Sequence, residues 1–228
     1  MASDYAYGPE VSYWRAYGKW STSETETAVT ASVTVGMQSM GYGIDIQYNT
    51  IKSSITFDGT TKAAEGNFYS DDGTWVTTDY TTITKTFAKG TSAYNKEAWA
   101  NVTNESGFLN GSSTAYMNFY IPALKSYTVA YNANGGSSVP VSQTKWYGQT
   151  LKLSSSKPSR TGYIFQGWAT SASGSVTYQP GANYTANAAV TLYAIWKAVT
   201  YTVSYNANGG SGAPGNQTKT YGAALTLS

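Results

Sequence analysis

The segment Tyr127-Thr-Val-Ala-Tyr-Asn-Ala-Asn-Gly-Gly136 recurs as Tyr201-Thr-Val-Ser-Tyr-Asn-Ala-Asn-Gly-Gly210, at an offset of 74 residues. Without any gap, 19 of the 28 positions in 127–154 are identical to their counterparts in 201–228. A match of this length identifies one structural unit that occurs twice. The second copy stops at Ser228, so we expect one complete and one incomplete unit.

The repeated unit has the pattern of short strands and turns. Tyr127, Val129 and Tyr131 alternate with polar or small residues, which predicts a strand, and Asn134-Gly135-Gly136 tolerates the positive φ of a turn. Further strands are expected at 143–147, 163–168 and 190–196, with a short turn at 151–156 and a loop at 157–162.

The second copy has only the first two of these strands. A lone two-stranded hairpin is marginal in water. Residues 201–228 therefore pack on something else, are disordered, or are the stub of a longer natural chain, and we favour the stub.

The ordered motifs of the unit resemble a known family. They are Tyr-Asn-Ala-Asn-Gly-Gly, Tyr147-Gly148, Arg160-Thr-Gly-Tyr-Ile-Phe-Gln-Gly-Trp168 and Leu192-Tyr-Ala-Ile-Trp196. This pattern resembles the Listeria–Bacteroides repeat, or internalin B-repeat. The resemblance implies a β-grasp-like module, found in tandem on bacterial surface proteins and in phage structural proteins as a stalk, spacer or weak adhesive unit. It implies no catalytic residues, and it suggests that six recurrent positions determine the fold: Gly135, Gly136, Gly162, Gly167, Trp168 and Trp196.

Residues 1–126 contain no repeat but show about eight alternating segments. We expect strands at 29–35, 44–48, 51–57, 68–70, 75–80, 83–87, 98–102 and 115–121. The segments on either side of Asp71-Asp72-Gly73 are predicted to form a hairpin. This spacing of strands and turns is typical of a β-sandwich. We therefore expect an all-β chain with a β-sandwich at 1–126, a β-grasp-like module at 127–198 and an incomplete second repeat at 199–228.

The composition excludes several kinds of chemistry. Charged residues make up 11% of the chain, aromatic residues 15%, and there is neither Cys nor His. These absences remove disulfides, thiolate metal sites and the commonest general base and metal ligand. All 12 acidic residues precede residue 127, and the six basic residues after it form no stripe of the kind that binds nucleic acid. We expect no enzymatic activity, no catalytic residue, no metal and no cofactor.

Four tryptophans are the candidate ligand-binding residues: Trp14, Trp20, Trp75 and Trp99. Aromatic rings with amides nearby can stack on sugars, and amphipathic rings are enriched in interfaces. The alternative, favoured for any one of them, is packing in the core. Glu24 and Glu26 form a possible carboxylate pair for glycoside hydrolysis, and Asp71-Asp72-Gly73 a possible calcium loop, but both are better explained as exposed loop residues.

These features predict a non-enzymatic structural or host-attachment protein of a phage virion. The order of sandwich and repeat resembles phage tail proteins, and Met1–Glu10 lacks the pattern of a secretory signal peptide. The alternative is a bacterial cell-surface adhesin or stalk fragment with carbohydrate-binding capacity. Expected partners are other virion proteins, copies of the chain itself and host cell-surface glycans. We expect neither nucleic-acid binding nor membrane insertion, and a location in a virion or at the cell surface.

Overall fold

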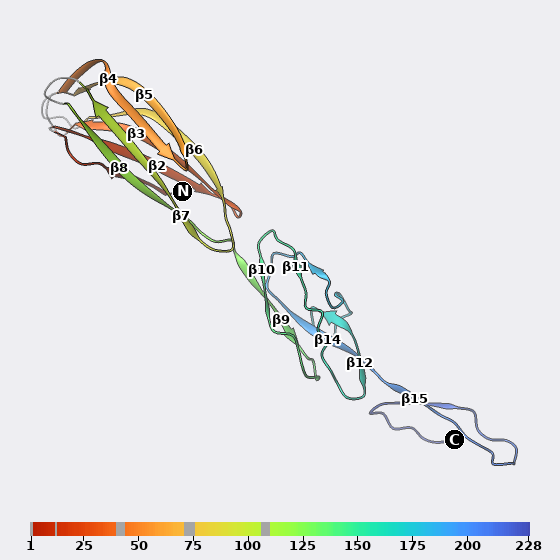
Figure 1. Ribbon diagram of the computed structural model, residues 1–228. Coiled ribbons are helices and arrows are strands. Elements are labelled where there is room, and N and C mark those ends of the chain that lie inside the picture. The colour runs from red at the N-terminus through yellow and green to blue at the C-terminus, as the bar shows by residue number, and fades with distance from the viewer. Residues whose placement is uncertain (1, 12, 40–43, 71–75, 106–109) are drawn as a thin grey trace. The chain divides into compact units, whose positions relative to one another are not determined.

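The chain forms two compact units in a computed structural model, Met1–Leu124 and Lys125–Ser228 (Figure 1). The structure describes residues 2–11, 13–39, 44–70, 76–105 and 110–228. The described residues contain strands and turns but no helix, as the sequence predicted. The finer division into 1–126, 127–198 and 199–228 stays a prediction.

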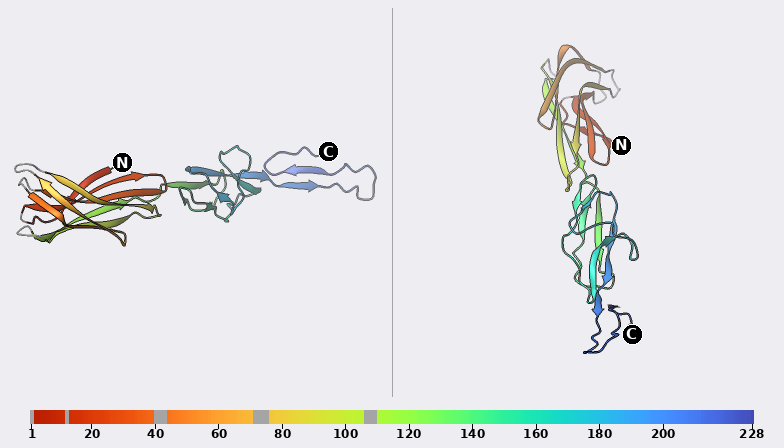
Figure 2. Two further views of the ribbon diagram at one scale, coloured as in Figure 1. Left: turned by 90° about the horizontal axis from the view of Figure 1, so that it is seen from above. Right: turned by 90° about the vertical axis from the view of Figure 1, so that its right-hand side faces the viewer.

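The N-terminal unit is a β-sandwich of two four-stranded antiparallel sheets (Figures 1 and 2). One sheet has the order β1-β2-β3-β6 and the other the order β5-β4-β7-β8. The strands are β1 (Ala2–Tyr7), β2 (Trp14–Glu24), β3 (Ala28–Ser39), β4 (Ile44–Phe57), β5 (Thr60–Ser70), β6 (Thr77–Ala88), β7 (Tyr94–Asn104) and β8 (Gly111–Ile121).

The core of the sandwich consists of the alternating apolar residues of both sheets. On β3, β7 and β8 the predicted inward faces are buried: Val29, Ala31, Val33, Val35, Ala98, Ala100, Val102, Ala115, Met117, Phe119 and Ile121. Phe57 packs its ring 5.3 Å from that of Phe87 and 5.0 Å from that of Phe119. Since every second side chain of a strand points to the same face, strict alternation predicts this core directly.

The opposite face of the β3–β6 pair is lined by hydroxyl groups. Thr30 pairs with Thr86, Ser32 with Thr84 and Thr34 with Thr82, at oxygen–oxygen distances of 2.7–2.9 Å. Cross-strand hydroxyl pairs of this kind stabilise a sheet without charge. They explain how a chain so poor in charged residues covers a solvent-exposed face.

The predicted hairpin around residues 71–73 is wrong. Strand β5 pairs with β4 and strand β6 pairs with β3, so the chain passes from one sheet to the other between them. Turn residues predict where a chain reverses, but they do not decide which strand the next segment pairs with. The expected short strand at 75–80 and the strand at 83–87 fall largely within one strand, β6, while β1 and β2 were not predicted.

The C-terminal unit begins with a four-stranded mixed sheet of order β10-β9-β14-β12. Strand β14 runs parallel to β9, and the other two pairs are antiparallel. This arrangement matches the expected β-grasp-like module, although no helix covers the sheet. The strands of the complete repeat are β9 (Ser126–Asn132), β10 (Gln143–Trp146), β11 (Leu151–Lys152), β12 (Tyr163–Ala169), β13 (Asn183–Tyr184) and β14 (Val190–Ala198). The turn expected at 151–156 begins instead with β11, which pairs with β13.

A small core holds the complete repeat together. Trp168 lies at its centre, with ring centroids 4.9 Å from Tyr131 and 5.0 Å from Phe165. Strand β12 carries an irregularity between Phe165 and Gly167, and Gly167 has a φ of 146°. A Cβ there would lie 2.4 Å from Val176, so the glycine allows the loop before β13 to cross the strand closely.

The second copy reproduces the first half of the complete repeat. Strands β15 (Thr200–Val203) and β16 (Gln217–Thr220) pair in the register of β9 and β10, since Val203 faces Gln217 as Val129 faces Gln143. Figure 2 shows this pair as an extended hairpin. The sequence repeat is therefore also a repeat of backbone geometry.

Candidate functional site

The structure does not bring the four candidate tryptophans together. Trp14 is 0% exposed and lies in the sandwich core, so its ring packs there and offers no surface to a ligand. Trp20 is half-buried on the same strand, β2, with its ring centroid 5.3 Å from that of Phe119 in an edge-to-face contact. Trp99 is 40% exposed on β7 of the other sheet. Trp75 lies outside the described residues.

Trp99 is instead the centre of an exposed aromatic surface. In the register of β7 and β8 it lies directly opposite Tyr116, which is 73% exposed. Tyr120, four residues further along β8, is 67% exposed on the same face. Glu97 and Asn118 face each other between these rings. We name this surface, Trp99, Tyr116 and Tyr120 with Glu97 and Asn118, the β8 aromatic face.

Two hollows adjoin the β8 aromatic face. A small one of about 190 Å³ lies between β7 and β8 and is lined by Glu97, Ala98, Tyr116, Met117 and Asn118. A larger one of about 420 Å³ is lined by Trp20, Thr22, Glu24, Val29, Phe119, Tyr120 and Pro122. Tyr120 belongs both to this hollow and to the β8 aromatic face. Rings, an amide and carboxylates are thus present around the β8 edge of the sandwich.

Sequence reasoning missed the two tyrosines of this face. Tyr116, Asn118 and Tyr120 alternate with the buried residues of β8, so their outward direction follows from the same pattern that predicts the core. The signal that could have found them is the presence of two tyrosines on the polar side of a regular strand.

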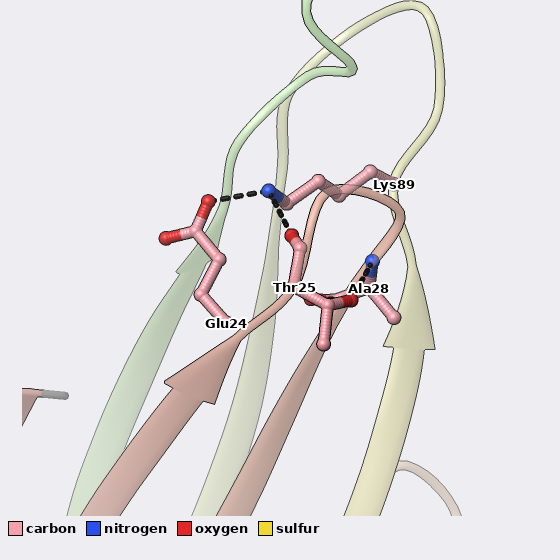
Figure 3. A network of polar contacts seen from close by, with 4 residues as sticks. All are labelled: Glu24, Thr25, Ala28 and Lys89. Carbon is pink, nitrogen blue, oxygen red and sulfur yellow. Dashed lines mark hydrogen bonds and ion pairs between the residues drawn. The ribbon is translucent and has the colours of Figure 1, made fainter. Parts of the chain in front are cut away.

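Glu24 is the last residue of β2, at the turn to β3 (Figure 3), and Glu26 lies within that turn. The Glu24 carboxylate forms an ion pair with Lys89, whose Nζ also donates to the Thr25 carbonyl oxygen at 2.7 Å. The side-chain hydroxyl of Thr25 accepts a hydrogen bond from the Ala28 backbone N–H at 3.0 Å, which closes the β2–β3 turn. Glu24, Thr25, Glu26 and Lys89 line an open hollow of about 510 Å³.

Two other carboxylates form ion pairs that hold them ionised. A hydrogen bond from Lys96, at 2.6 Å, lowers the pKa of Asp58. Burial alone would raise the pKa of Asp79, but hydrogen bonds from Lys19, at 2.6 Å, and from the Tyr17 hydroxyl outweigh it and leave that pKa below its usual range. A general acid needs the opposite shift, so these groups suit structural ion pairs.

The repeat unit buries one charged side chain. Lys145 on β10 is 0% exposed, and its Nζ donates to the Trp146 carbonyl oxygen at 2.7 Å and to Asn187 Oδ1 at 3.0 Å. The Gly148 backbone N–H donates to the same Asn187 oxygen at 2.9 Å. These neutral oxygens replace a carboxylate partner in a segment whose sequence contains no acidic residue after residue 126.

Residues 127–195 and 201–228 match the Listeria-Bacteroides repeat domain family. The C-terminal unit is built from Listeria-Bacteroides repeats. No curated protein and no solved structure matches the chain. The second match covers the first half of the repeat domain only, in agreement with the shared register of β15–β16 and β9–β10.

The family motifs lie where the complete Listeria-Bacteroides repeat turns sharply or packs its backbone closely against other residues. Asn134 and Gly135 adopt positive φ values of 47° and 86° in the turn after β9. A Cβ on Gly136 would lie 2.6 Å from both the Ser159 carbonyl oxygen and the Trp196 ring. Trp196 Nε1 donates to the Ala133 carbonyl oxygen at 2.9 Å. These residues are needed for the packing of the fold.

Listeria-Bacteroides repeats occur in surface and extracellular proteins, which assigns this chain to that broad class. In the described part of the chain no three His, Cys, Asp or Glu side chains are grouped so as to hold a metal ion. The possible calcium loop at Asp71-Asp72-Gly73 lies outside the described residues. Among the residues that the structure describes, no helix is long and apolar enough to cross a membrane.

Proposed function

We propose that the protein is a non-enzymatic structural or host-attachment component of a phage virion. The observation that carries the proposal is the combination of two parts in one chain. One part consists of repeats that occur in surface proteins, and the other is a β-sandwich with an exposed aromatic face. A sandwich with an exposed aromatic face, followed in the sequence by repeats, suits attachment or assembly. Its partners are other virion proteins or copies of the chain.

The chemistry of the acidic residues supports the non-enzymatic part of the proposal. Glu24 is paired with Lys89, and Asp79 with Lys19 and Tyr17. Acid–base hydrolysis of a glycoside needs two carboxyl groups across a cleft, one of them with a raised pKa. The paired carboxylates instead connect β2 with β6 and the residue that follows it, the two strands on either side of β3.

The location is tested by mass spectrometry of particles purified from cells that carry the gene, with the cell-wall fraction analysed in parallel. We expect peptides from both units in the particles, at a constant ratio to the major capsid and tail proteins. Recovery only in the wall fraction of cells that produce no particles would overturn the virion assignment.

The alternative function is a bacterial cell-surface adhesin or stalk with carbohydrate-binding capacity. One specific observation favours it, the exposed pair of Trp99 and Tyr116 with Asn118 and Glu97 beside it. Trp and Tyr rings combine an apolar face, on which a sugar ring can stack, with a polar tip. The amide and carboxylate supply hydrogen-bond donors and acceptors for its hydroxyls.

Glycan binding is tested with an array of host cell-surface glycans. We expect Trp99→Ala and Tyr116→Ala each to reduce binding about tenfold, which corresponds to 1.4 kcal/mol. Tyr5→Ala is the matched control, since it removes an exposed ring from the other sheet. Equal losses in all three variants, or no binding by the unaltered chain, would exclude the β8 aromatic face as a glycan site.

A further inference from the structure

The second repeat consists of little more than a hairpin, and an isolated hairpin is marginal in water. Yet it reproduces the internal hydrogen bonds of the complete repeat. Gln143 Nε2 donates to the Lys152 carbonyl oxygen at 3.1 Å. Gln217 Nε2 and the Thr226 carbonyl oxygen, each 74 residues later in the sequence, form the same hydrogen bond at 3.1 Å. Something outside the hairpin must help to hold this geometry.

Tyr221 of the hairpin contacts Gly162 of the complete repeat. Gly162 lies in the loop before β12 and adopts a φ of 77°, a conformation that favours glycine. A Cβ at this position would lie 2.2 Å from two atoms of the Tyr221 ring. The tyrosine ring therefore occupies the place where any other residue would carry its side chain.

Backbone hydrogen bonds connect the same residues. The Val199 N–H donates to the Gly162 carbonyl oxygen at 2.9 Å, and the Tyr221 N–H donates to the Val199 carbonyl oxygen at 2.9 Å. Val199 thus links the loop of the complete repeat to the end of the second hairpin.

Neighbouring aromatic and basic side chains extend the contact. The Tyr163 ring meets the Tyr221 ring edge to face at 5.8 Å, and the Arg160 guanidinium lies 3.8 Å from the centre of the Tyr163 ring. A row of Arg160, Tyr163 and Tyr221 therefore covers the junction.

The repeat explains why Tyr221 is available for this contact. Its counterpart Tyr147 donates its backbone N–H to the Lys125 carbonyl oxygen at 2.9 Å, and Lys125 is the counterpart of Val199. In each copy, a backbone hydrogen bond thus joins the tyrosine that follows the second strand to the residue that precedes the first strand. The tyrosine is positioned by its own hairpin and needs no later part of the repeat.

We propose that Gly162 and Tyr221 form a joint by which one Listeria-Bacteroides repeat docks the hairpin of the next. The partner that this surface takes is the first hairpin of a following repeat, with a tyrosine after its second strand. The receiving side is the Arg160-Thr161-Gly162-Tyr163 segment. This inference goes beyond the proposed function and holds whether the protein is carried by a virion or by a cell.

The joint makes the fold of the second hairpin depend on residues of the first repeat. Hydrogen exchange of the full chain measures this, because it reports the opening of individual strands. In Tyr221→Ala we expect amides of Thr200–Val203 and Gln217–Thr220 to exchange at least about tenfold faster. Tyr221→Phe keeps the ring and should leave their exchange unchanged. Tyr201→Ala, which removes an exposed ring from the same hairpin, should change it less than about threefold.

A second variant pair tests the receiving side. Gly162 and Gly181 have nearly the same φ, 77° and 76°, but an added Cβ would lie within 4 Å of another residue only at Gly162. Gly162→Ala and Gly181→Ala are therefore a matched pair. We expect only Gly162→Ala to speed exchange in the second hairpin. Amides of Ser126–Asn132 report whether the first repeat stays folded. If Tyr221→Ala leaves the hairpin as protected as in the unaltered chain, or if Tyr201→Ala exposes it equally, the joint does not exist.

Discussion

Lys145 and Asn187 stand 42 residues apart in the sequence, and Lys145 Nζ lies 3.0 Å from Asn187 Oδ1 inside the complete repeat. The lysine is fully buried, and its other hydrogen-bond partner is the Trp146 carbonyl oxygen. A buried ammonium group without a carboxylate depends on such neutral acceptors. Asn187 thereby ties the segment before β14 to β10 and to the Tyr147-Gly148 turn.

Substitution of either partner should destabilise the complete repeat. Lys145→Met removes the charge together with its hydrogen bonds and should cost about 1–2 kcal/mol of the free energy of unfolding. Asn187→Ala leaves the charge buried with one acceptor fewer and should cost more, about 2–3 kcal/mol. Urea unfolding followed by tryptophan fluorescence measures both.

The second copy supplies the control for this prediction. Lys219 is the counterpart of Lys145, but it donates to the Ala223 carbonyl oxygen and is not fully buried. Lys219→Met should therefore change the unfolding of the complete repeat by less than about 0.5 kcal/mol. The explanation fails if Asn187→Ala proves less harmful than Lys145→Met.

Gly136 and Gly210 give a second comparison between the two copies. A Cβ on Gly136 would lie 2.6 Å from both the Ser159 carbonyl oxygen and Trp196 Cζ2, whereas on Gly210 it would meet only the Ala207 carbonyl oxygen closely, at 3.2 Å. Gly136→Ala should push the Trp196 ring away from its Ala133 hydrogen bond. We expect a loss of about 1–3 kcal/mol, typical of overpacking, and a loss below about 1 kcal/mol for Gly210→Ala.

Thermal unfolding of the two glycine variants under one buffer condition checks this prediction. The complete repeat should melt at a lower temperature in Gly136→Ala only. Equal shifts in both variants would mean that the turn itself, which the copies share, is responsible rather than the contact with Trp196.

The sandwich core could be predicted because small or apolar residues recur at every second position over Val29–Val35, Ala98–Val102 and Ala115–Ile121. Strand β2 was missed because it breaks that rule on both faces. On the inward face, Gly18 lies between Trp14 and Trp20 and contributes no side chain to the core. On the outward face, Tyr17 is buried as well. A strand with aromatic residues on both faces has no period of two to detect.

The candidate site was predicted less well than the core, because only part of it follows from alternation. Tyr116 and Tyr120 alternate with the buried residues of β8, whereas the burial of Tyr17 beside Trp14 on β2 depends on tertiary packing. Trp14, between Tyr13 and Arg15, lies in the core, whereas Trp99, between the buried Ala98 and Ala100, lies on the surface. The joint of Gly162 and Tyr221 shows the same limit. The sequence identified Gly162 as important for the fold, but the contact that requires it lies 59 residues away and in the next repeat.

Asp79 makes the stability of the sandwich depend on pH. It accepts hydrogen bonds from Lys19 and Tyr17, and its pKa is lower in the folded chain than the usual value of about 3.9. As the pH falls, the unfolded chain therefore binds the proton first. The stabilisation by Asp79 is fully present above about pH 4 and is lost as the pH falls through the folded-state pKa.

Asp79→Asn should consequently be less stable than the unaltered chain at pH 7 but equally stable in acid. Because the Lys19–Asp79 pair is partly exposed, we expect a difference of about 0.5–1 kcal/mol at pH 7. Thermal unfolding between pH 2 and pH 8 measures it. A difference that persists unchanged at pH 2 would show that the substitution disturbs packing rather than charge.

Tyr17 adds a second dependence at the alkaline end of the range. Burial, and after it the hydrogen bond to Asp79, raises the pKa of the Tyr17 hydroxyl above its usual value of about 10. The folded chain therefore keeps this proton when the unfolded chain has begun to lose it. The contribution of Tyr17 is fully present below about pH 10 and is lost as the pH rises from there through the folded-state pKa.

Tyr17→Phe removes the ionisable group, so the unfolding free energy of this variant should fall less steeply between pH 9 and pH 11 than that of the unaltered chain. Equal slopes would show that the Tyr17 hydroxyl titrates alike in both states, and that its contact with Asp79 does not form in solution.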